Sequence, residues 1–308
     1  MQRFESIPSS PLVSMGGLSE VFNHSLFLNG TDEVRRKIML QSAEEKYQSE
    51  LENPFNQYFN MDLLPFLKGK VIMDLGCFTG GRSVAWCERY DPMLLVGIDM
   101  KQEYIDAARQ FAEIKRVHAD FKLARGEHLP SGGEEFDAIL SYDVFEHVQD
   151  LSKTLSECHR VLKVGGRLIV VFPSYFHPTE HHLGLVTRVP AIHYLFGGRT
   201  LVNAYYEICR DRGNEAGWYA RKYPKLDDWE RGNTINGTTL SQFRRLIRNQ
   251  HWKVVLHGRK PIGSLMRGSS LKGTGRLISY ALYPFVFLPF FEEIFLNRVA
   301  YVLEKNSI

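Results

Sequence analysis

From Lys70 onward, short apolar runs alternate with helix-length amphipathic segments, and this alternation constrains the fold more than any other feature of the sequence. The apolar runs are VIMDLG, MLLVGID, FKLARG, FDAILSYD and GRLIVVFP, and helical patterns such as KQEYIDAARQFAEI separate them. Buried parallel strands are rich in Val, Ile and Leu, and each parallel pair needs a crossover connection that is usually a helix. The alternation therefore predicts an α/β fold with a Rossmann-like, doubly wound sheet and helices on both faces.

The rest of the chain divides around this core. Residues 1–69 are predicted to form an N-terminal helical lid, because Glu33–Asn53 is rich in helix formers. Residues 70–174 are predicted to form the Rossmann-like core itself. Residues 175–250 are rich in His, Tyr, Arg, Gly and Asn with weak periodicity, which indicates an insertion after the fifth strand that shapes an acceptor pocket. Residues 251–308 add the strands WKVVLHG and RVAYVLEK, with an apolar helical insert between them.

Composition and charge narrow the functional classes. The 308 residues are 44% hydrophobic and 24% charged, which is typical of a globular protein and excludes disorder as the main state. A net charge of +3 without a long basic run argues against a nucleic-acid partner. The four cysteines show no CxxC spacing, and the first residues lack an apolar signal-peptide core, so a cytoplasmic location is predicted.

The longest apolar stretch, Leu277–Phe291, spans 15 residues and contains Pro284 and Pro289. A membrane-crossing helix needs about 20 residues. Two interpretations stay open for this stretch: peripheral contact with a membrane, or a buried pair of short helices packed on the sheet or on a second subunit of a homo-oligomer. The sequence favours the buried interpretation, because it shows no clear polar face of a membrane-surface helix.

The first apolar run ends in DLGCFTGG (residues 74–81) and leads directly into a helix. Glycines allow a tight strand-to-helix turn, and the helix N-terminus offers free N–H groups, so a nucleotide-type cofactor is expected. Asp99 ends the second strand, 23 residues after Gly76, where a carboxylate reaches ribose hydroxyls. Phe78 occupies the position of the middle glycine in a dinucleotide fingerprint, which argues against a dinucleotide.

Four segments in order, DLGCFTGG, VGIDM, ARGEHLP and FDAILSYDVFEHV followed by HRVLKVGGRLIVVFP, resemble the class I S-adenosylmethionine-dependent methyltransferases. The resemblance covers roughly residues 70–174 and implies S-adenosylmethionine as the cofactor. Two residues depart from the family pattern: Phe78 replaces the usual second glycine, and Arg125 stands where an acid often contacts adenine.

The resemblance also implies roles for the residues of the cofactor site. It implies that Gly76, Cys77 and Gly80 line the methionyl and ribose part, with Asp74 and Phe78 as further cofactor-site residues of the same motif, and that Asp99 holds the ribose hydroxyls. Met100 would pack on adenine with Gly126 and Glu127 beside it, and Tyr142 and Asp143 would close the pocket near the amino-acid end.

Methyl transfer to a hydroxyl needs a base, and histidine titrates near neutral pH. Glu146-His147 is expected to begin a helix after the fourth strand, which makes His147 one candidate. After the fifth strand come Tyr175, His177, Glu180, His181 and His182. His181 or His182 is the preferred base, and Tyr175 is expected to orient the acceptor. Adjacent histidines usually diverge, so no metal site is predicted.

The sequence thus predicts S-adenosylmethionine-dependent O-methylation of a hydroxyl on a sugar, a glycan or a related small-molecule intermediate. One alternative is N- or C-methylation of a small natural-product metabolite, which needs less of a base. An alternative of another class is a non-catalytic scaffold or binding protein that retains the fold, for which Phe78 is the sequence hint.

Overall fold

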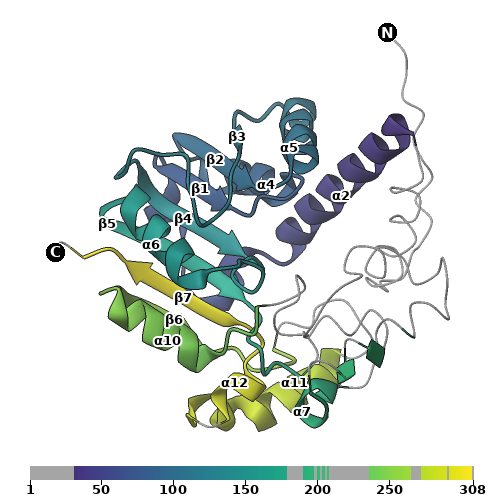
Figure 1. The fold of residues 1–308 in the computed structure, drawn as a ribbon, viewed down its shortest axis with the longest axis vertical. Coiled ribbons are helices and arrows are strands. Elements are labelled where there is room, and N and C mark those ends of the chain that lie inside the picture. The colour runs from purple at the N-terminus through teal and green to yellow at the C-terminus, as the bar shows by residue number, and fades with distance from the viewer. Residues whose placement is uncertain are drawn as a thin grey trace.

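Seven strands form one sheet in the order β3-β2-β1-β4-β5-β7-β6 (Figure 1). The computed structural model describes residues 31–178, 190–197, 200–201, 203–204, 207, 236–264, 272–289 and 291–306. The strands are β1 (Val71–Leu75), β2 (Leu94–Asp99), β3 (Asp120–Leu123), β4 (Phe136–Tyr142), β5 (Leu162–Phe172), β6 (Lys253–Gly258) and β7 (Val299–Glu304). The prediction of a Rossmann-like α/β sheet is confirmed.

The first five strands are parallel, and helices cross between them. The crossover helices are α4 (Gly81–Tyr90), α5 (Gln102–Lys115) and α6 (Leu151–Val161). The strand order reverses between β1 and β4, which are neighbours in the sheet, with Met73 paired to Ile139. In open α/β sheets, ligands bind at the carboxyl ends of the strands beside such a reversal. The topology therefore places the expected site at the carboxyl ends of β1 and β4.

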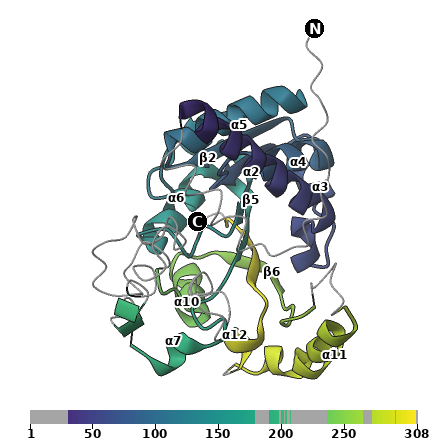
Figure 2. The same ribbon diagram turned by 90° about the vertical axis from the view of Figure 1, so that its right-hand side faces the viewer.

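The two C-terminal strands run antiparallel at one edge of the sheet. β7 lies between β5 and β6, with Ile169 opposite Val302. Helix α10 (Leu240–Asn249) precedes β6, and the connection from β6 to β7 contains α11 (Lys272–Leu282), η4 (Tyr283–Phe287) and α12 (Glu292–Phe295). A further short helix, α7 (Ile192–Leu195), follows β5. Figures 1 and 2 both place α7, α11 and α12 at the same end of the molecule.

Side chains of successive strand residues alternate between two apolar layers. On one face, Ile72 and Ala300 pack with Trp86 of α4 and with residues from η1 (Phe55–Tyr58) and α3 (Leu64–Leu67). On the other face, the strands pack against α6 and α10, where Phe243 is fully buried. Both faces are thus covered along the sheet.

The N-terminal helix α2 (Asp32–Glu52) packs on α4 and α5. It begins at Thr31, whose side chain accepts a hydrogen bond from the Val34 N–H. A Cβ atom added to Gly81 would lie 2.0 Å from the Ala43 carbonyl oxygen, so α2 rests directly on the backbone of α4. The expected lid covers residues 1–69, and residues 1–30 of it lie outside the described ranges.

The expectation that Glu146 and His147 begin a helix is wrong. Both lie in a turn, and α6 begins at Leu151. The Asp150 side chain caps this helix by accepting a hydrogen bond from the Lys153 N–H at 2.9 Å. Asp150 is the stronger helix start because its carboxylate satisfies an N–H that the first turn would otherwise leave unpaired.

The interpretation of residues 277–291 as helices buried on the sheet is wrong for most of this stretch, while packing on a second subunit stays a prediction. The side chains of Leu277 and Tyr280 are 71% and 77% exposed. The physical reason is that, among the described residues of this stretch, only Val286 reaches the core, so the stretch packs on the domain at one point and most of its other apolar residues face solvent. Among the described residues, the helices fall short of the length and apolarity that a membrane span requires.

Candidate active site

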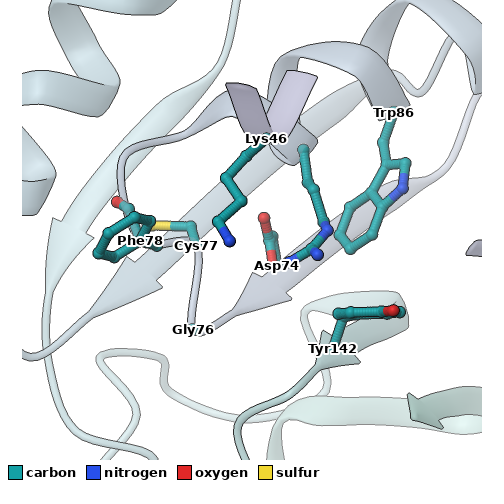
Figure 3. Close-up of a pocket in the computed structure, with 8 residues that line it drawn as sticks. Lys46, Asp74, Gly76, Cys77, Phe78, Trp86 and Tyr142 are labelled. Atoms are coloured by element: carbon teal, nitrogen blue, oxygen red, sulfur yellow. The ribbon is translucent and has the colours of Figure 1, made fainter. Parts of the chain in front are cut away.

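A hollow of about 260 Å³, counted to its open mouth, lies at the carboxyl ends of β1 and β4 (Figure 3). Its walls come from β1, β4, α4 and α2. The residues that line it are Lys46, Asp74, Gly76, Cys77, Phe78, Arg82, Trp86 and Tyr142.

The floor of the hollow is the turn between β1 and α4. Gly76 and Gly80 have φ angles of 84° and 79°, in the left-handed region that glycine adopts without strain. Phe78 also has a positive φ of 49°, which is uncommon for a residue with a Cβ. Its ring packs edge-on against Tyr104 with the centroids 4.4 Å apart, which supports this conformation. The turn therefore keeps its tight shape although Phe78 replaces the glycine typical of the family.

Asp99 fixes this turn from the end of β2. One carboxylate oxygen accepts a hydrogen bond from the Phe78 N–H at 3.1 Å, and the other accepts one from the Lys101 N–H at 3.2 Å. Burial raises the pKa of Asp99, and these backbone donors oppose the shift. Asp99, the acid expected to hold the ribose, is thus hydrogen-bonded to the backbone of the expected cofactor turn.

Asp74 is a second, fully buried acid in the wall of the hollow. The Ser83 hydroxyl donates a hydrogen bond to it at 2.5 Å. Burial raises the pKa of Asp74 to about 7, with further upward contributions from Asp99 and Glu50, while Ser83 and the Arg82 charge lower it. The carboxyl is therefore divided between its neutral and charged forms near neutral pH.

Two cations face this acid. Lys46 of α2 extends into the hollow from above, as Figure 3 shows. The guanidinium carbon of Arg82 lies 4.0 Å from the centre of the Tyr142 ring. Tyr142 is held in turn by Tyr58, with the two hydroxyl oxygens 2.8 Å apart. The hollow thus combines a carboxyl group, two cations and three aromatic side chains, those of Phe78, Trp86 and Tyr142.

The sequence prediction missed Lys46, Arg82 and Trp86. Arg82 lies in the first turn of the helix that follows the glycines, a position that could have marked it. Lys46 had no such signal, because it reaches the hollow only through the packing of α2 on α4.

The residues expected at the adenine end lie outside the hollow's lining. Met100 is 54% exposed. Glu127 accepts hydrogen bonds from the backbone N–H groups of Gln149 and Asp150 at 2.8 and 3.2 Å, and so joins two loops. Gly126 packs near α6, where an added Cβ would lie 3.0 Å from the Thr154 methyl carbon. Their proposed contacts with a cofactor stay predictions.

The candidate catalytic residues lie in several separate segments of the chain. The His147 side chain is 40% exposed, with its Nε2 atom 3.7 Å from a Glu146 oxygen. Tyr175 follows β5, and its carbonyl oxygen lies 2.9 Å from His193 Nε2. His181 and His182 lie outside the described residues. No histidine of the described ranges is part of the hollow's lining.

Two further predictions concern Asp143 and metal binding. Asp143 lies at the end of β4 and forms an ion pair with Arg298 at 3.3 Å. Within the described ranges, no three His, Cys, Asp or Glu side chains are grouped so that they could hold a metal ion. His177 is buried there, while Glu180, His181 and His182 are outside those ranges.

The strand order, the glycine turn after β1 and the acid at the end of β2 together define the Rossmann-like fold of class I S-adenosylmethionine-dependent methyltransferases. Comparison with known families agrees, because residues 73–170 match the family described as "Methyltransferase domain". Residues 73–170 are therefore similar to a methyltransferase domain, and the fold of this part of the chain is the Rossmann-like fold of class I methyltransferases.

Curated relatives support the same assignment. A ubiquinone biosynthesis O-methyltransferase of Coxiella burnetii is 31% identical over 102 residues, which cover 33% of this chain and 43% of the relative. The chain spans less than half the length of the curated relatives it matches.

Solved structures add agreement at the level of the fold. A Haloferax volcanii complex of the Trm112 methyltransferase activator with a methyltransferase matches with a TM-score of 0.53 and 13% identity, over 87% of this chain and 98% of that one. The geranyl diphosphate C-methyltransferase of Streptomyces coelicolor matches with a TM-score of 0.51 and 16% identity, over 85% and 83%. At these identities, the likeness concerns the fold alone.

Proposed function

We propose that this protein is an S-adenosylmethionine-dependent O-methyltransferase that modifies a hydroxyl group of a small molecule. The observation that carries the proposal is the charged hollow at the carboxyl ends of β1 and β4. The curated relatives, which are named O-methyltransferases, support transfer to oxygen. Their names concern ubiquinone biosynthesis, so a sugar or glycan acceptor rests on the sequence prediction, as does a cytoplasmic location.

The residues of the hollow fit the donor's amino-acid end. This end carries an ammonium and a carboxylate group, and the hollow offers the Asp74 carboxyl to the first and the Lys46 and Arg82 cations to the second. When bound, S-adenosylmethionine supplies a methyl group on a positively charged sulfur, ready for in-line displacement. Asp99 would hold the ribose hydroxyls, because each carboxylate oxygen can accept a further hydrogen bond beyond its backbone donor.

The acceptor side needs a group that takes the hydroxyl proton. His181 or His182 is the proposed base, since a histidine with an ordinary pKa near 6.5 accepts a proton at neutral pH. Tyr175 would orient the acceptor, because it follows the carboxyl end of β5, two strands from β1 in the sheet. His147, which follows β4, is the other candidate base.

Calorimetric titration with S-adenosylmethionine, S-adenosylhomocysteine and NAD tests the donor. We expect binding of the first two and none of NAD. The Asp99→Asn variant should bind S-adenosylmethionine about 10–100-fold more weakly, because it loses charge-assisted hydrogen bonds to the ribose. Asp106→Asn is the matched control, since Asp106 is an exposed acid on α5 that pairs with Arg109. Equal affinities of the two variants would contradict the role of Asp99.

Turnover measurements test the transfer itself. The protein is incubated with S-adenosylmethionine and panels of sugars and other small hydroxyl compounds, and methylated products are detected by mass spectrometry. The double variant His181→Ala and His182→Ala should keep its donor affinity but lose about 10²–10⁴-fold in turnover, which is the usual contribution of a general base. Unchanged turnover with the true acceptor would exclude both histidines as the base.

A further inference from the structure

A row of large apolar side chains faces solvent on α11 and η4 and just after them. We call it the apolar ridge. Each of its members is at least 37% exposed, and Tyr280 and Leu277 are more than 70% exposed. The members are Leu277, Ile278, Tyr280, Tyr283, Phe285, Phe287, Leu288 and Phe291. Monomeric proteins rarely expose contiguous apolar patches of more than a few hundred Å², and larger ones mark interaction sites.

Packing contacts with the domain core hold the apolar ridge in place. Val286, inside η4, is fully buried in the main core. The Phe285 ring packs against Phe291 and Phe295, with centroids 5.7 and 5.4 Å apart. The packed rings show that this surface is built into the fold and held in shape when it is exposed.

Ion pairs of α12, which follows the ridge directly, connect it to α10 and to the sheet. Glu292, 3% exposed, pairs with Arg244 at 2.8 Å and with Arg259 at 2.9 Å. Arg244 also donates a hydrogen bond to the Tyr301 hydroxyl at 2.8 Å. Because these contacts join the ridge to α10 and β7, the ridge keeps a fixed position on the domain.

The segment that leads into the ridge is rich in cations. Arg259 is paired with Glu292, and four further Lys and Arg residues lie between Arg259 and Leu277, with no Asp or Glu before Glu292. These cations are Lys260, Arg267, Lys272 and Arg276. Apolar and aromatic side chains flanked by cations are typical of segments that lie in the interface of anionic membranes.

A second exposed apolar group lies at the same end of the molecule. On and next to α7, Tyr194, Leu195 and Phe196 are 39%, 76% and 49% exposed. Figure 2 shows α7, α12 and α11 along one edge of the domain, and Figure 1 shows them at the same end from another side. Two apolar groups from distant parts of the chain thus share one end.

We propose that this end of the molecule docks on the surface of a lipid bilayer that contains anionic headgroups, with the apolar ridge inserted at the interface. Contact would be peripheral, since α11 has 11 residues and a helix that crosses the hydrocarbon needs about 20. A second copy of the chain fits less well, because a symmetric contact would bring two copies of this cation-rich segment together. The proposal stands independently of the acceptor and of the methyl-transfer reaction.

Sedimentation of the full-length protein with vesicles tests the proposal. Vesicles of phosphatidylcholine alone are compared with vesicles that also contain phosphatidylglycerol, at low and at high salt. We expect sedimentation with the anionic vesicles, weaker binding at high salt, and little binding to phosphatidylcholine alone. Absence of binding to the anionic vesicles would overturn the proposal.

A double variant, Leu277→Ser and Tyr280→Ser, removes the two most exposed members of the ridge. Its partition onto anionic vesicles should fall about tenfold or more, since burial of one large apolar side chain contributes about 1.5–3 kcal/mol. Met93→Ser is the control, because Met93 is 68% exposed just before β2, away from the ridge. Circular dichroism and the thermal midpoint should match the wild type for both variants.

Analytical ultracentrifugation of the same proteins tests whether a second copy of the chain covers the ridge instead. A wild-type dimer that the double variant converts to a monomer, while vesicle binding is unchanged, would assign the ridge to self-association and overturn the membrane proposal. A monomeric wild type, together with reduced vesicle binding of the double variant, supports it. Donor titrations should give equal affinities for wild type and variant, which separates this result from any failure of the proposed function.

Discussion

The two ends of the sheet are held together in different ways. At the donor end, backbone groups make the key contacts: the Gly76 N–H donates to the Ile98 carbonyl oxygen at 2.8 Å, and Asp99 accepts the Phe78 N–H. At the other end, around β6 and β7, long side chains meet over large sequence separations, as Arg244 and Glu292 do. The backbone contacts of the donor end depend on short sequence motifs, whereas the long-range side-chain contacts of the other end correspond to no motif.

The two ends also differ in how they respond to protons. Burial favours the protonated form of Asp74 at the donor end. At the other end, burial and the charges of Arg259 and Arg244 lower the pKa of His257 to about 3, so His257 is neutral at physiological pH. Its ring stacks on Tyr301 with the centroids 4.1 Å apart. A rise of pH should therefore lower the stability of the donor end, and a fall of pH should lower the stability of the other end.

The largest expected effect comes from Gly81→Ala at the donor end. The added Cβ would lie 2.0 Å from the Ala43 carbonyl oxygen and 2.8 Å from the Tyr47 nitrogen, so α2 must move away from α4. We expect a loss of about 1–3 kcal/mol in the free energy of unfolding, the usual cost of overpacking. Chemical denaturation followed by circular dichroism measures it.

Gly132→Ala is the control for that experiment, because its added Cβ would meet nothing closer than the Glu135 carboxylate oxygen, at 3.7 Å. If both variants lost the same stability, the backbone contact between α2 and α4 would not be what holds the donor end. Donor affinity should fall in Gly81→Ala alone, since Lys46 reaches the hollow from α2.

The next effect concerns Asp74 and rising pH. Its pKa is raised in the folded state, so its contribution to stability is complete below pH 3.8 and is lost as pH rises through about 7. In Asp74→Asn this loss is absent, and the thermal midpoint should fall less between pH 4 and pH 7 than in the wild type. Midpoint curves that stay parallel over this range would show that Asp74 does not titrate there.

The smallest expected effect concerns His257 and falling pH. Its folded pKa is lowered, so its contribution is present above pH 6.5 and is lost as pH falls toward about 3. His257→Gln removes this titration, and the wild type should lose more thermal stability than the variant between pH 7 and pH 4.5. A steeper loss in the variant would contradict a neutral, buried His257.

The contrast between the two ends also explains what could be predicted from the sequence. The apolar runs located the strands to within a few residues, because parallel buried strands are continuous Val, Ile and Leu segments. The turn at Gly76 and the acid at Asp99 were visible because both depend on local spacing. Residue spacing alone was therefore enough to predict that Asp99 lies beside the glycine turn, whose Phe78 N–H it accepts.

Other features depended on tertiary packing. Lys46 enters the hollow only because α2 rests on Gly81, a contact between residues with no shared motif. The run from Leu277 to Phe291 is equally apolar whether it lies in a core or on a surface, and periodicity does not separate the two. Tertiary packing decides between them: among the described residues of this run, only Val286 is buried in the core.

The connection between β6 and β7 combines two kinds of segment. These strands pair from Lys253–Glu304 to Gly258–Ala300, so their hydrogen-bonded ladder does not include the 40 residues that join them. Val286 and Glu292 tie the second half of the connection to the core, whereas Leu277 and Tyr280 of α11 are largely exposed. Long surface insertions cost little once their ends are fixed. The α11 part of this connection can therefore vary in length and sequence while the sheet and its anchor stay unchanged.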